Sequence, residues 1–75
     1  MILRKGDKNA TVATLQEWLN ELGFKYLHSS GEHRSLKVDG DFGAKTEEVV
    51  LEFQESEGLY TDGIVGPMTY KSLGL

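Results

Sequence analysis

One short segment occurs twice in this chain, and the repeat constrains the fold more than any other feature. Residues 39–46 read DGDFGAKT, and residues 62–69 read DGIVGPMT. In each copy the Asp carboxylate can accept backbone N–H bonds while the Gly that follows adopts a positive φ. The Phe or Val is then expected to enter the core, and the Thr to bond locally in the first turn of a helix. The repeat therefore predicts two Asp-Gly turns, each leading directly into a helix.

Acidic loops repeated at this interval also raise the possibility of a pair of calcium sites. Calcium loops need oxygen ligands at fixed positions and end on an acidic residue. Counting from Asp39, position 3 is Asp41, but positions 5 and 12 are Gly43 and Val50. Counting from Asp62, positions 3 and 5 are Ile64 and Gly66. The pattern disfavours calcium and favours a structural role for the repeat.

The fold must be held by packing and turn chemistry alone. The chain has 75 residues, no cysteine and one proline, which excludes disulfides and thiolate zinc sites. Hydrophobic residues make up 39% of the chain, enough for one core and one domain, which we take as residues 1–75. We expect a monomer that carries no cofactor and no metal.

Charge excludes several classes of partner. Eight basic residues against twelve acidic ones give a net charge of -4, and the basic residues are scattered along the chain. A duplex-binding protein usually presents a basic face, so nucleic acid is disfavoured, as are anionic membrane surfaces. The longest apolar runs are residues 1–3 and 49–51, so neither a membrane span nor a signal peptide is expected within this chain.

Apolar periodicity predicts three helices. The first spans about residues 10–22, with Asp7 or Asn9 available to cap its start and Gly23 to end it. Its apolar stripe consists of Val12, Leu15, Leu19 and Leu22. The second spans about residues 44–57 and ends at Gly58. Its inward face should consist of Thr46, Val49, Val50 and Phe53.

The third helix begins at Gly66-Pro67, with Pro in the first turn, and its inward residues should be Met68 or Thr69, then Tyr70 and Leu73. Residues 24–38 show no helical period. Strand-like alternation at Phe24 and Tyr26, and again at Leu36 and Val38, flanks a turn signal at residues 29–31, so this segment is either a loop or a short hairpin. The predicted fold class is all-α, a small three-helix bundle with Asp-Gly turn loops.

Several motifs follow one another in a fixed order along nearly the whole chain. They are Leu3-Arg4-x-Gly6-Asp7, Val12-x-x-Leu15-Gln16-x-x-Leu19, Leu22-Gly23-Phe24, Val38-Asp39-Gly40-x-Phe42-Gly43-x-x-Thr46, Val49-Val50-x-x-Phe53-Gln54-x-x-x-Gly58-Leu59 and Asp62-Gly63-x-Val65-Gly66-Pro67-x-Thr69. Together they resemble the bacterial peptidoglycan-binding domain, a three-helix cell-wall module. The resemblance implies a non-catalytic domain that binds peptidoglycan and anchors a covalently linked wall-lytic or wall-remodelling enzyme, outside the cell or at the wall.

The chain departs from this family pattern at four places. Tyr70 stands where Trp is usual, Val49 stands where Ala is usual, and Leu51 occupies a solvent-facing position that is more often polar. Residues 28–35 look like an insertion.

Exposed aromatic faces and a few orienting polar groups usually hold polymers of this kind. The candidate ligand-binding residues are Trp18, Tyr26, Asp39, Tyr60, Asp62 and Tyr70. Four of them have a structural alternative, and the position of Tyr26 depends on whether the hairpin forms. Trp18 and Tyr70 can be core residues, the latter with its hydroxyl reaching a surface partner, and the two aspartates can be consumed by their own turns. Tyr60, in a loop after Gly58, is the ring most expected to be exposed.

Three other functions are weaker alternatives. His28, Glu32 and His33 are potential zinc ligands, but a solvated loop suits them better than a site lacking a rigid scaffold. A glycosidase needs two carboxylates across a cleft, which a bundle of this size does not offer. The same scaffold could also be a protein-interaction or structural module without wall binding, using Leu51 or residues 28–35.

Overall fold

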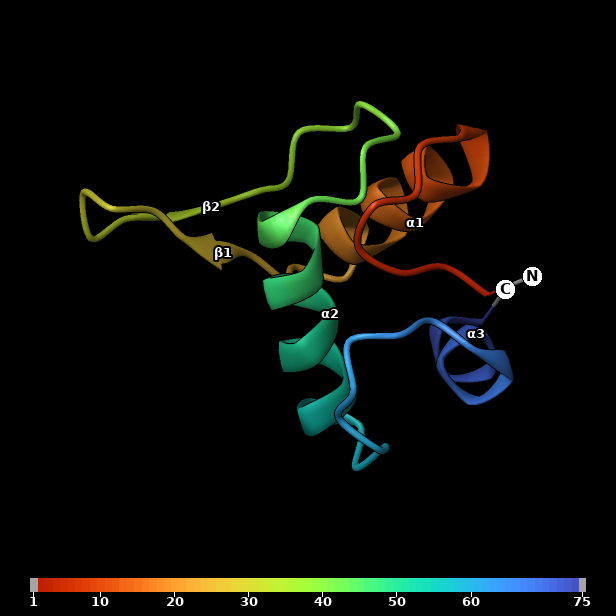
Figure 1. The fold of residues 1–75 in the computed structure, drawn as a ribbon. Coiled ribbons are helices and arrows are strands. Elements are labelled where there is room, and N and C mark those ends of the chain that lie inside the picture. Colours follow the sequence, from red (N-terminus) through yellow and green to blue (C-terminus); the bar gives the residue numbers. More distant parts are fainter. Residues whose placement is uncertain (1, 75) are drawn as a thin grey trace.

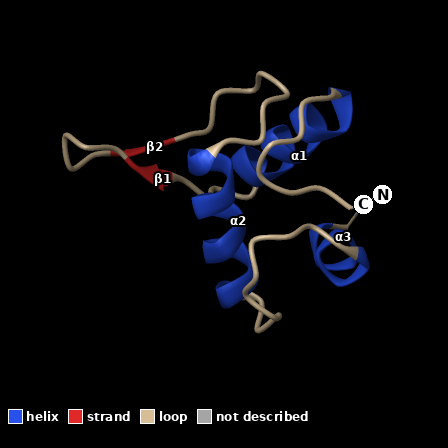
Figure 2. Ribbon diagram, viewed as in Figure 1, coloured by secondary structure: helices blue, strands red, loops and turns tan. Residues whose placement is uncertain are grey.

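The computed structural model describes residues 2–74, in which three helices surround a small core. In chain order the elements are α1 (Ala10–Glu21), β1 (Tyr26–Leu27), β2 (His33–Arg34), α2 (Ala44–Ser56) and α3 (Pro67–Leu73). The three predicted helices are confirmed, whereas the all-α class is wrong in part, because β1 and β2 form a two-stranded antiparallel sheet. Figure 2 shows this sheet projecting beside α2, on the side away from α1, in a mostly helical chain.

Helix ends follow local chemistry. Asn9 caps α1, its Oδ1 accepting from the N–H of Val12 at 2.9 Å. Asp7, the other candidate cap, instead accepts from the N–H of Arg4 at 3.0 Å. Gly23 lies just beyond the C-terminus of α1 with φ 86°, the left-handed conformation that glycine adopts without steric cost.

The hairpin extends away from the helices (Figure 1) and pairs Tyr26 with Arg34 and Leu27 with His33. Its strands are shorter than the alternation predicts. Phe24 leaves the strand to pack edge-to-face on Phe53, with ring centroids 5.3 Å apart, and Val38 is 44% exposed. The insertion therefore forms a short hairpin, and only the base of this hairpin packs against the core.

An N-terminal segment, residues 3–9, connects the two repeat copies. Leu3 and Val65 exchange backbone hydrogen bonds at 3.1 and 2.8 Å. Further along, Gly6 N–H donates to the carbonyl of Phe42 and Phe42 N–H donates to the carbonyl of Asp7, both at 2.9 Å. Backbone hydrogen bonds thus join both loops to one strand-like segment. The helical periodicity of the sequence does not predict this segment.

The core contains the expected apolar side chain of each repeat copy, Phe42 and Val65, both fully buried. Its members are Leu3, Val12, Leu15, Leu19, Tyr26, Leu36, Phe42, Val49, Val50, Phe53, Val65 and Leu73. The inward assignment of Leu22 is wrong, because Leu22 is 47% exposed. Of the two alternatives for α3, Thr69 is buried and Met68 is exposed.

Candidate functional site

Two buried glutamines organise the repeated loops. The buried polar residues within 2–74 are Gln16, Thr46, Gln54 and Thr69, one Gln and one Thr for each repeat copy. An uncharged amide can offer two donors and an acceptor, which suits it to join several backbone groups at once. Because buried polar groups need partners, each Gln holds a loop in one conformation.

Gln16 of α1 holds the first loop through both ends of its amide. Its Nε2 donates to Asp39 Oδ1 at 3.2 Å, to the carbonyl of Asp41 at 3.0 Å and to Thr46 Oγ1 at 3.1 Å. Its Oε1 accepts from the N–H groups of Asp39 and Gly40, at 3.1 and 2.9 Å. The loop therefore closes on the preceding helix.

Gln54 of α2 makes four of the five equivalent contacts with the second loop, since the N–H of Asp62 donates to the carbonyl of Tyr60 instead. Its Nε2 donates to Asp62 Oδ1, the carbonyl of Ile64 and Thr69 Oγ1 at 3.1, 2.9 and 3.1 Å. Its Oε1 accepts from Gly63 N–H at 2.9 Å. The Thr hydroxyls thus accept from the glutamines, where the sequence predicts a bond within the first turn of each helix.

The two repeat aspartates each use one carboxylate oxygen in this network. Asp39 Oδ1 also accepts from Asp41 N–H, and Asp62 Oδ1 from Ile64 N–H, both at 2.9 Å. The Asp41 amide, followed by the Gln16 side chain, holds the pKa of Asp39 below its ordinary value, because both donors favour the charged form. The aspartates therefore have a structural role that does not depend on a ligand.

A pocket of about 400 Å³, here called the hairpin pocket, lies beside the first loop. It brings together two predicted site residues, Tyr26 and Asp39. The ring of Tyr26 is almost fully buried, and the Lys45 ammonium lies 5.0 Å from its centroid, within cation–π range. The complete lining is Gln16, Tyr26, Leu36, Lys37, Asp39, Asp41, Gly43, Ala44, Lys45 and Thr46.

A second pocket of about 440 Å³, the tyrosine pocket, lies beside the second loop and brings together Tyr60 and Asp62. The Tyr60 ring is 86% exposed, in agreement with the sequence prediction. The complete lining is Gln54, Gly58, Leu59, Tyr60, Asp62, Ile64, Gly66, Pro67, Met68 and Thr69.

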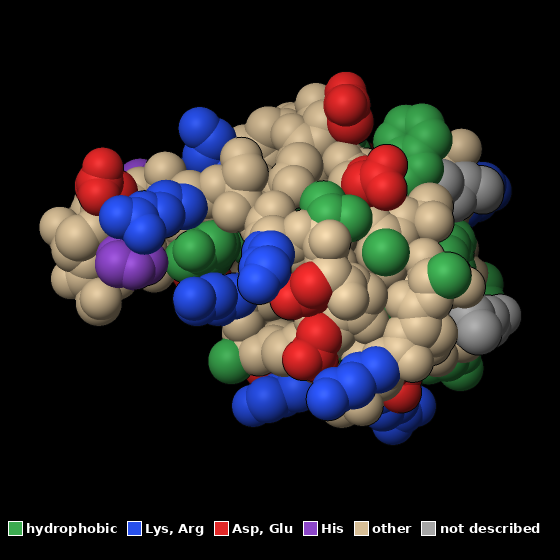
Figure 3. Space-filling view, turned by 90° about the horizontal axis from the view of Figure 1, so that it is seen from above, with side chains coloured by type: hydrophobic (Ala, Val, Ile, Leu, Met, Phe, Trp, Pro, Cys, Tyr) green, Lys and Arg blue, Asp and Glu red, His purple; other side chains and the backbone are tan. Residues whose placement is uncertain are grey.

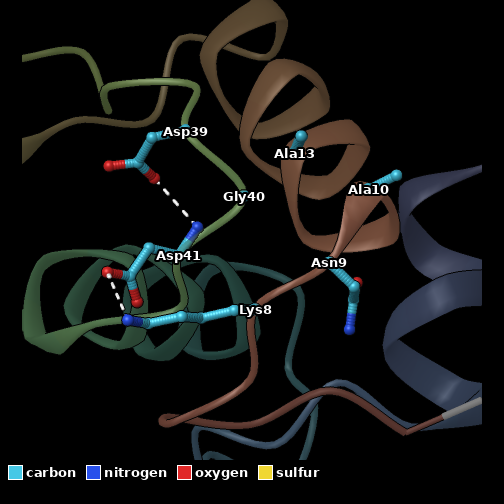
Figure 4. Close-up of a pocket in the computed structure, with 7 residues that line it drawn as sticks. All are labelled: Lys8, Asn9, Ala10, Ala13, Asp39, Gly40 and Asp41. Carbon is cyan, nitrogen blue, oxygen red and sulfur yellow. Dashed lines mark hydrogen bonds and ion pairs between the residues drawn. The ribbon is translucent and has the colours of Figure 1, made fainter.

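The outer side of the first loop lines a third hollow, drawn in Figure 4. Here the chain of Gly40 passes close to α1 at Ala13, and Lys8 reaches toward Asp41 (Figure 4). Their charged atoms are 4.0 Å apart and both side chains are at least half exposed, so this ion pair adds little stability.

The remaining predicted site residues lie apart from these pockets. Trp18 is on α1, is 39% exposed and lines none of the three hollows. Tyr70 packs half-buried against the core, and burial raises the pKa of its hydroxyl. That hydroxyl is buried without a hydrogen-bond partner among residues 2–74, so the expected surface partner is not found there.

The hairpin residues weighed as zinc ligands are used within the hairpin. Glu32 Oε1 accepts from Ser30 Oγ at 3.1 Å and from Arg34 at 3.0 Å. Within the described part of the chain, no three His, Cys, Asp or Glu side chains are grouped so as to hold a metal ion. Across residues 2–74, every helix is too short or too polar to cross a membrane.

Sequence reasoning quoted Gln16 and Gln54 only as motif letters and missed their function in the loops. It also missed Lys37, Lys45 and Met68 as pocket-lining residues. The signal for the glutamines was available: each follows a buried apolar residue on the helix that precedes a repeat copy.

Comparison with known proteins agrees with this architecture. Residues 8–73 match the family described as "Putative peptidoglycan binding domain". The chain is 44% identical over 62 residues to N-acetylmuramoyl-L-alanine amidase CwlM of Mycobacterium tuberculosis, covering 83% of this chain and 13% of the amidase. It thus spans a small part of that relative.

Two solved structures have the same fold. The SleB N-terminal domain is 32% identical with a TM-score of 0.83, covering 99% of this chain and 89% of that one. An endolysin from Burkholderia phage AP3 is 36% identical with a TM-score of 0.81, covering 97% of this chain and 24% of the endolysin.

Proposed function

The chain belongs to the peptidoglycan-binding domain family, and from this premise we propose that it anchors a longer cell-wall hydrolase or remodelling enzyme to its polymer. The domain is a binding module and not a catalyst, as in the wall-acting proteins that it matches. We propose that residues 1–75 form the whole module, that it is monomeric, and that it works outside the cell or at the wall without contacting nucleic acid or membrane.

The observation that carries the binding surface is the pair of pockets beside the repeated loops. Each places one aspartate at an open depression, beside the exposed ring of Tyr60 in the tyrosine pocket and the nearly buried ring of Tyr26 in the hairpin pocket. Aromatic faces bind sugar and peptide surfaces, while polar groups fix their orientation. Tyr60 has the most exposed ring and is proposed as the main contact. Trp18, exposed on α1 away from both pockets, would be a separate contact, whereas Tyr70 would support α3 from within rather than touch the polymer.

Such shallow pockets predict weak binding by a single module. Only a small part of a polymer can be buried in them, so attachment to a second wall-binding or catalytic domain would raise the effective concentration of each contact. This requirement fits a module that covers only 13% of the amidase it matches.

The alternative of a protein-interaction module using Leu51 gains no support. A Cβ added at Gly63 would lie 3.4 Å from Leu51 Cδ2, so this side chain packs against the second loop. Leu51 is half-buried there and does not present the free apolar surface that the sequence suggests.

Sedimentation with purified peptidoglycan sacculi tests the proposal. The wild-type protein is expected in the pellet at low salt, with and without removal of teichoic acids, and Tyr60→Ala is expected to shift it toward the supernatant. Leu27→Ala is the matched control, because Leu27 is 55% exposed but lines neither pocket. Wild-type protein that stays in the supernatant, or equal loss in the two variants, contradicts the proposed surface.

A further inference from the structure

The two pockets are related by the same repeat that relates the loops. The hairpin pocket is lined at seven positions whose equivalents line the tyrosine pocket. The pairs are Gln16 and Gln54, Asp39 and Asp62, Asp41 and Ile64, Gly43 and Gly66, Ala44 and Pro67, Lys45 and Met68, and Thr46 and Thr69. The pockets share one backbone framework, so their differences lie in side chains.

Those differences are mainly of charge. Lys45 in the first pocket corresponds to Met68 in the second, and Asp41 corresponds to Ile64. With Lys37 and Asp39 the hairpin pocket has two ammonium groups and two carboxylates, whereas Asp62 is the one charged residue lining the tyrosine pocket. Figure 3 shows basic and acidic side chains side by side where the hairpin joins the helices.

Part of this charge remains available to a ligand, although the Lys45 ammonium lies over the Tyr26 ring and Asp41 faces Lys8. Among residues 2–74 the ion pairs are Lys8 with Asp41, at 4.0 Å, and Glu32 with Arg34, so neither Lys37 nor Lys45 is paired there. The hydrogen bonds that Asp39 accepts from Gln16 and Asp41 use its Oδ1, which leaves its Oδ2 for a ligand.

The hairpin makes the wall of this pocket rigid. Asn20 of α1 forms two hydrogen bonds with the backbone of Leu36, one to its carbonyl and one from its N–H, both 2.8 Å. Glu48 of α2 accepts from Leu27 N–H at 2.9 Å. Both ends of the hairpin, on either side of residues 28–35, are thereby fixed, which leaves Tyr26 and Leu36 in place before a ligand arrives.

We infer that the hairpin pocket is a subsite for an amino-acid end group that carries both a free ammonium and a free carboxylate. The ligand carboxylate would contact Lys45 and its ammonium would contact Asp39 and Asp41, a charge-balanced arrangement that neither a simple anion nor a simple cation would satisfy. In peptidoglycan, which the proposed function supplies as the polymer, this group is the diamino-acid end of a stem peptide that is not cross-linked. Cross-linking acylates the amine and removes its charge, so the subsite would distinguish free stems from cross-linked ones.

Amide NMR titration with small probes tests this inference. The probes are meso-diaminopimelate, its diacetyl derivative, which lacks the ammonium groups, and its dimethyl ester, which lacks the carboxylates. We expect meso-diaminopimelate to shift the amides of Asp41, Gly43 and Lys45, and each derivative to bind about threefold to fivefold more weakly, as expected for the loss of one exposed ion pair.

Variants that copy the other pocket provide the matched comparison. Lys45→Met and Asp41→Ile are expected to weaken meso-diaminopimelate binding by a similar factor, whereas Lys5→Met, an exposed lysine outside both pockets, should leave it unchanged. The dispersion of each spectrum reports whether a variant is folded. Equal binding of all three probes, or shifts confined to Tyr60 and Met68, would overturn the inference.

The sacculus assay separates this inference from the proposed function. Wild-type protein that sediments with sacculi but shows no shifts in the hairpin pocket refutes the subsite and leaves wall binding standing. Selective binding of meso-diaminopimelate without sedimentation supports the subsite and contradicts wall binding by the isolated module. Failure in both assays refutes both.

Discussion

Gly40 and Gly63 form a matched pair of substitutions that measures how tightly the first loop packs on α1. Both have φ 75°, so Ala at either position forces an L-residue into the left-handed region, at about 1–2 kcal/mol. The surroundings differ. A Cβ at Gly40 would lie 2.9 Å from the backbone oxygen of Asn9, whereas at Gly63 the nearest atom is Cγ of Glu47, at 3.2 Å.

The Asn9 carbonyl cannot withdraw without breaking other bonds. It accepts from Ala13 N–H in the first turn of α1 at 3.4 Å, while Asn9 N–H donates to the carbonyl of Gly40 at 3.0 Å. The Glu47 side chain, by contrast, can rotate away. Overpacking a rigid site costs about 1–3 kcal/mol, so Gly40→Ala should lower the free energy of unfolding by about 2–5 kcal/mol and Gly63→Ala by about 1–2 kcal/mol.

Urea unfolding followed by helical circular dichroism measures both losses, and fluorescence of Trp18, the single tryptophan, provides a second probe of two-state behaviour. If Gly40→Ala is unfolded in buffer, an excluded osmolyte such as trimethylamine N-oxide can raise its folded population enough for the unfolding transition to be measured. Equal losses, within about 0.5 kcal/mol, would refute the close approach to Asn9. A neutral Gly63→Ala would refute the shared left-handed conformation.

Three further predictions concern the same framework. Gln16→Glu and Gln54→Glu place an oxygen where an NH₂ group now donates to three acceptors. Each substitution should lower the free energy of unfolding in urea at neutral pH by about 3 kcal/mol or more, and part of this loss should be regained in acid, where the new carboxyl is protonated. Equal stability of wild type and variants would contradict the proposed hydrogen bonding of the loops by these glutamines. Phe42→Ala and Phe53→Ala should each lower the free energy of unfolding in urea by about 3–5 kcal/mol, because both rings are buried. A loss below about 1 kcal/mol would contradict the placement of these rings in the core. The folded-state pKa of Asp39 lies below its ordinary value of 3.8, so the stability that its carboxylate contributes is present above that pH and is lost as the pH falls through the folded pKa. The melting temperature of Asp39→Asn should therefore fall less from pH 5 to pH 2.5 than that of the wild type. Parallel curves of melting temperature against pH would contradict this linkage.

The elements that sequence reasoning predicted well depend on neighbours close in the chain. The apolar stripe, the Asn9 cap and Gly23 lie within a few residues of the helix they define, and both bounds of α1 agree with the prediction to about one residue. The class was wrong in part because β1 and β2 contain only two residues each, too few for alternation to establish a strand against a loop.

The candidate site was only partly predictable because its residues meet across the fold. Tyr60 and Asp62 are two residues apart, and a shared surface position could be expected. Tyr26 and Asp39 line the same pocket only because the hairpin between them folds back. The hydroxyl of Tyr70 is buried, so this side chain does not present its polar end at the surface.

The sequence by itself determined the three helices, the repeated loops and the family, because helical period, caps and turn residues act over short separations along the chain. Only the tertiary structure decided what each loop closes on. Gln16 reaches a loop 23 residues away and Gln54 one only 8 residues away, yet the NH₂ groups of the two side chains donate to equivalent acceptors. Leu3 pairs with Val65 across almost the whole chain. Such contacts depend on how the helices pack. Packing places the hairpin pocket, with its mixed charges, and the tyrosine pocket at equivalent positions on a single repeated framework.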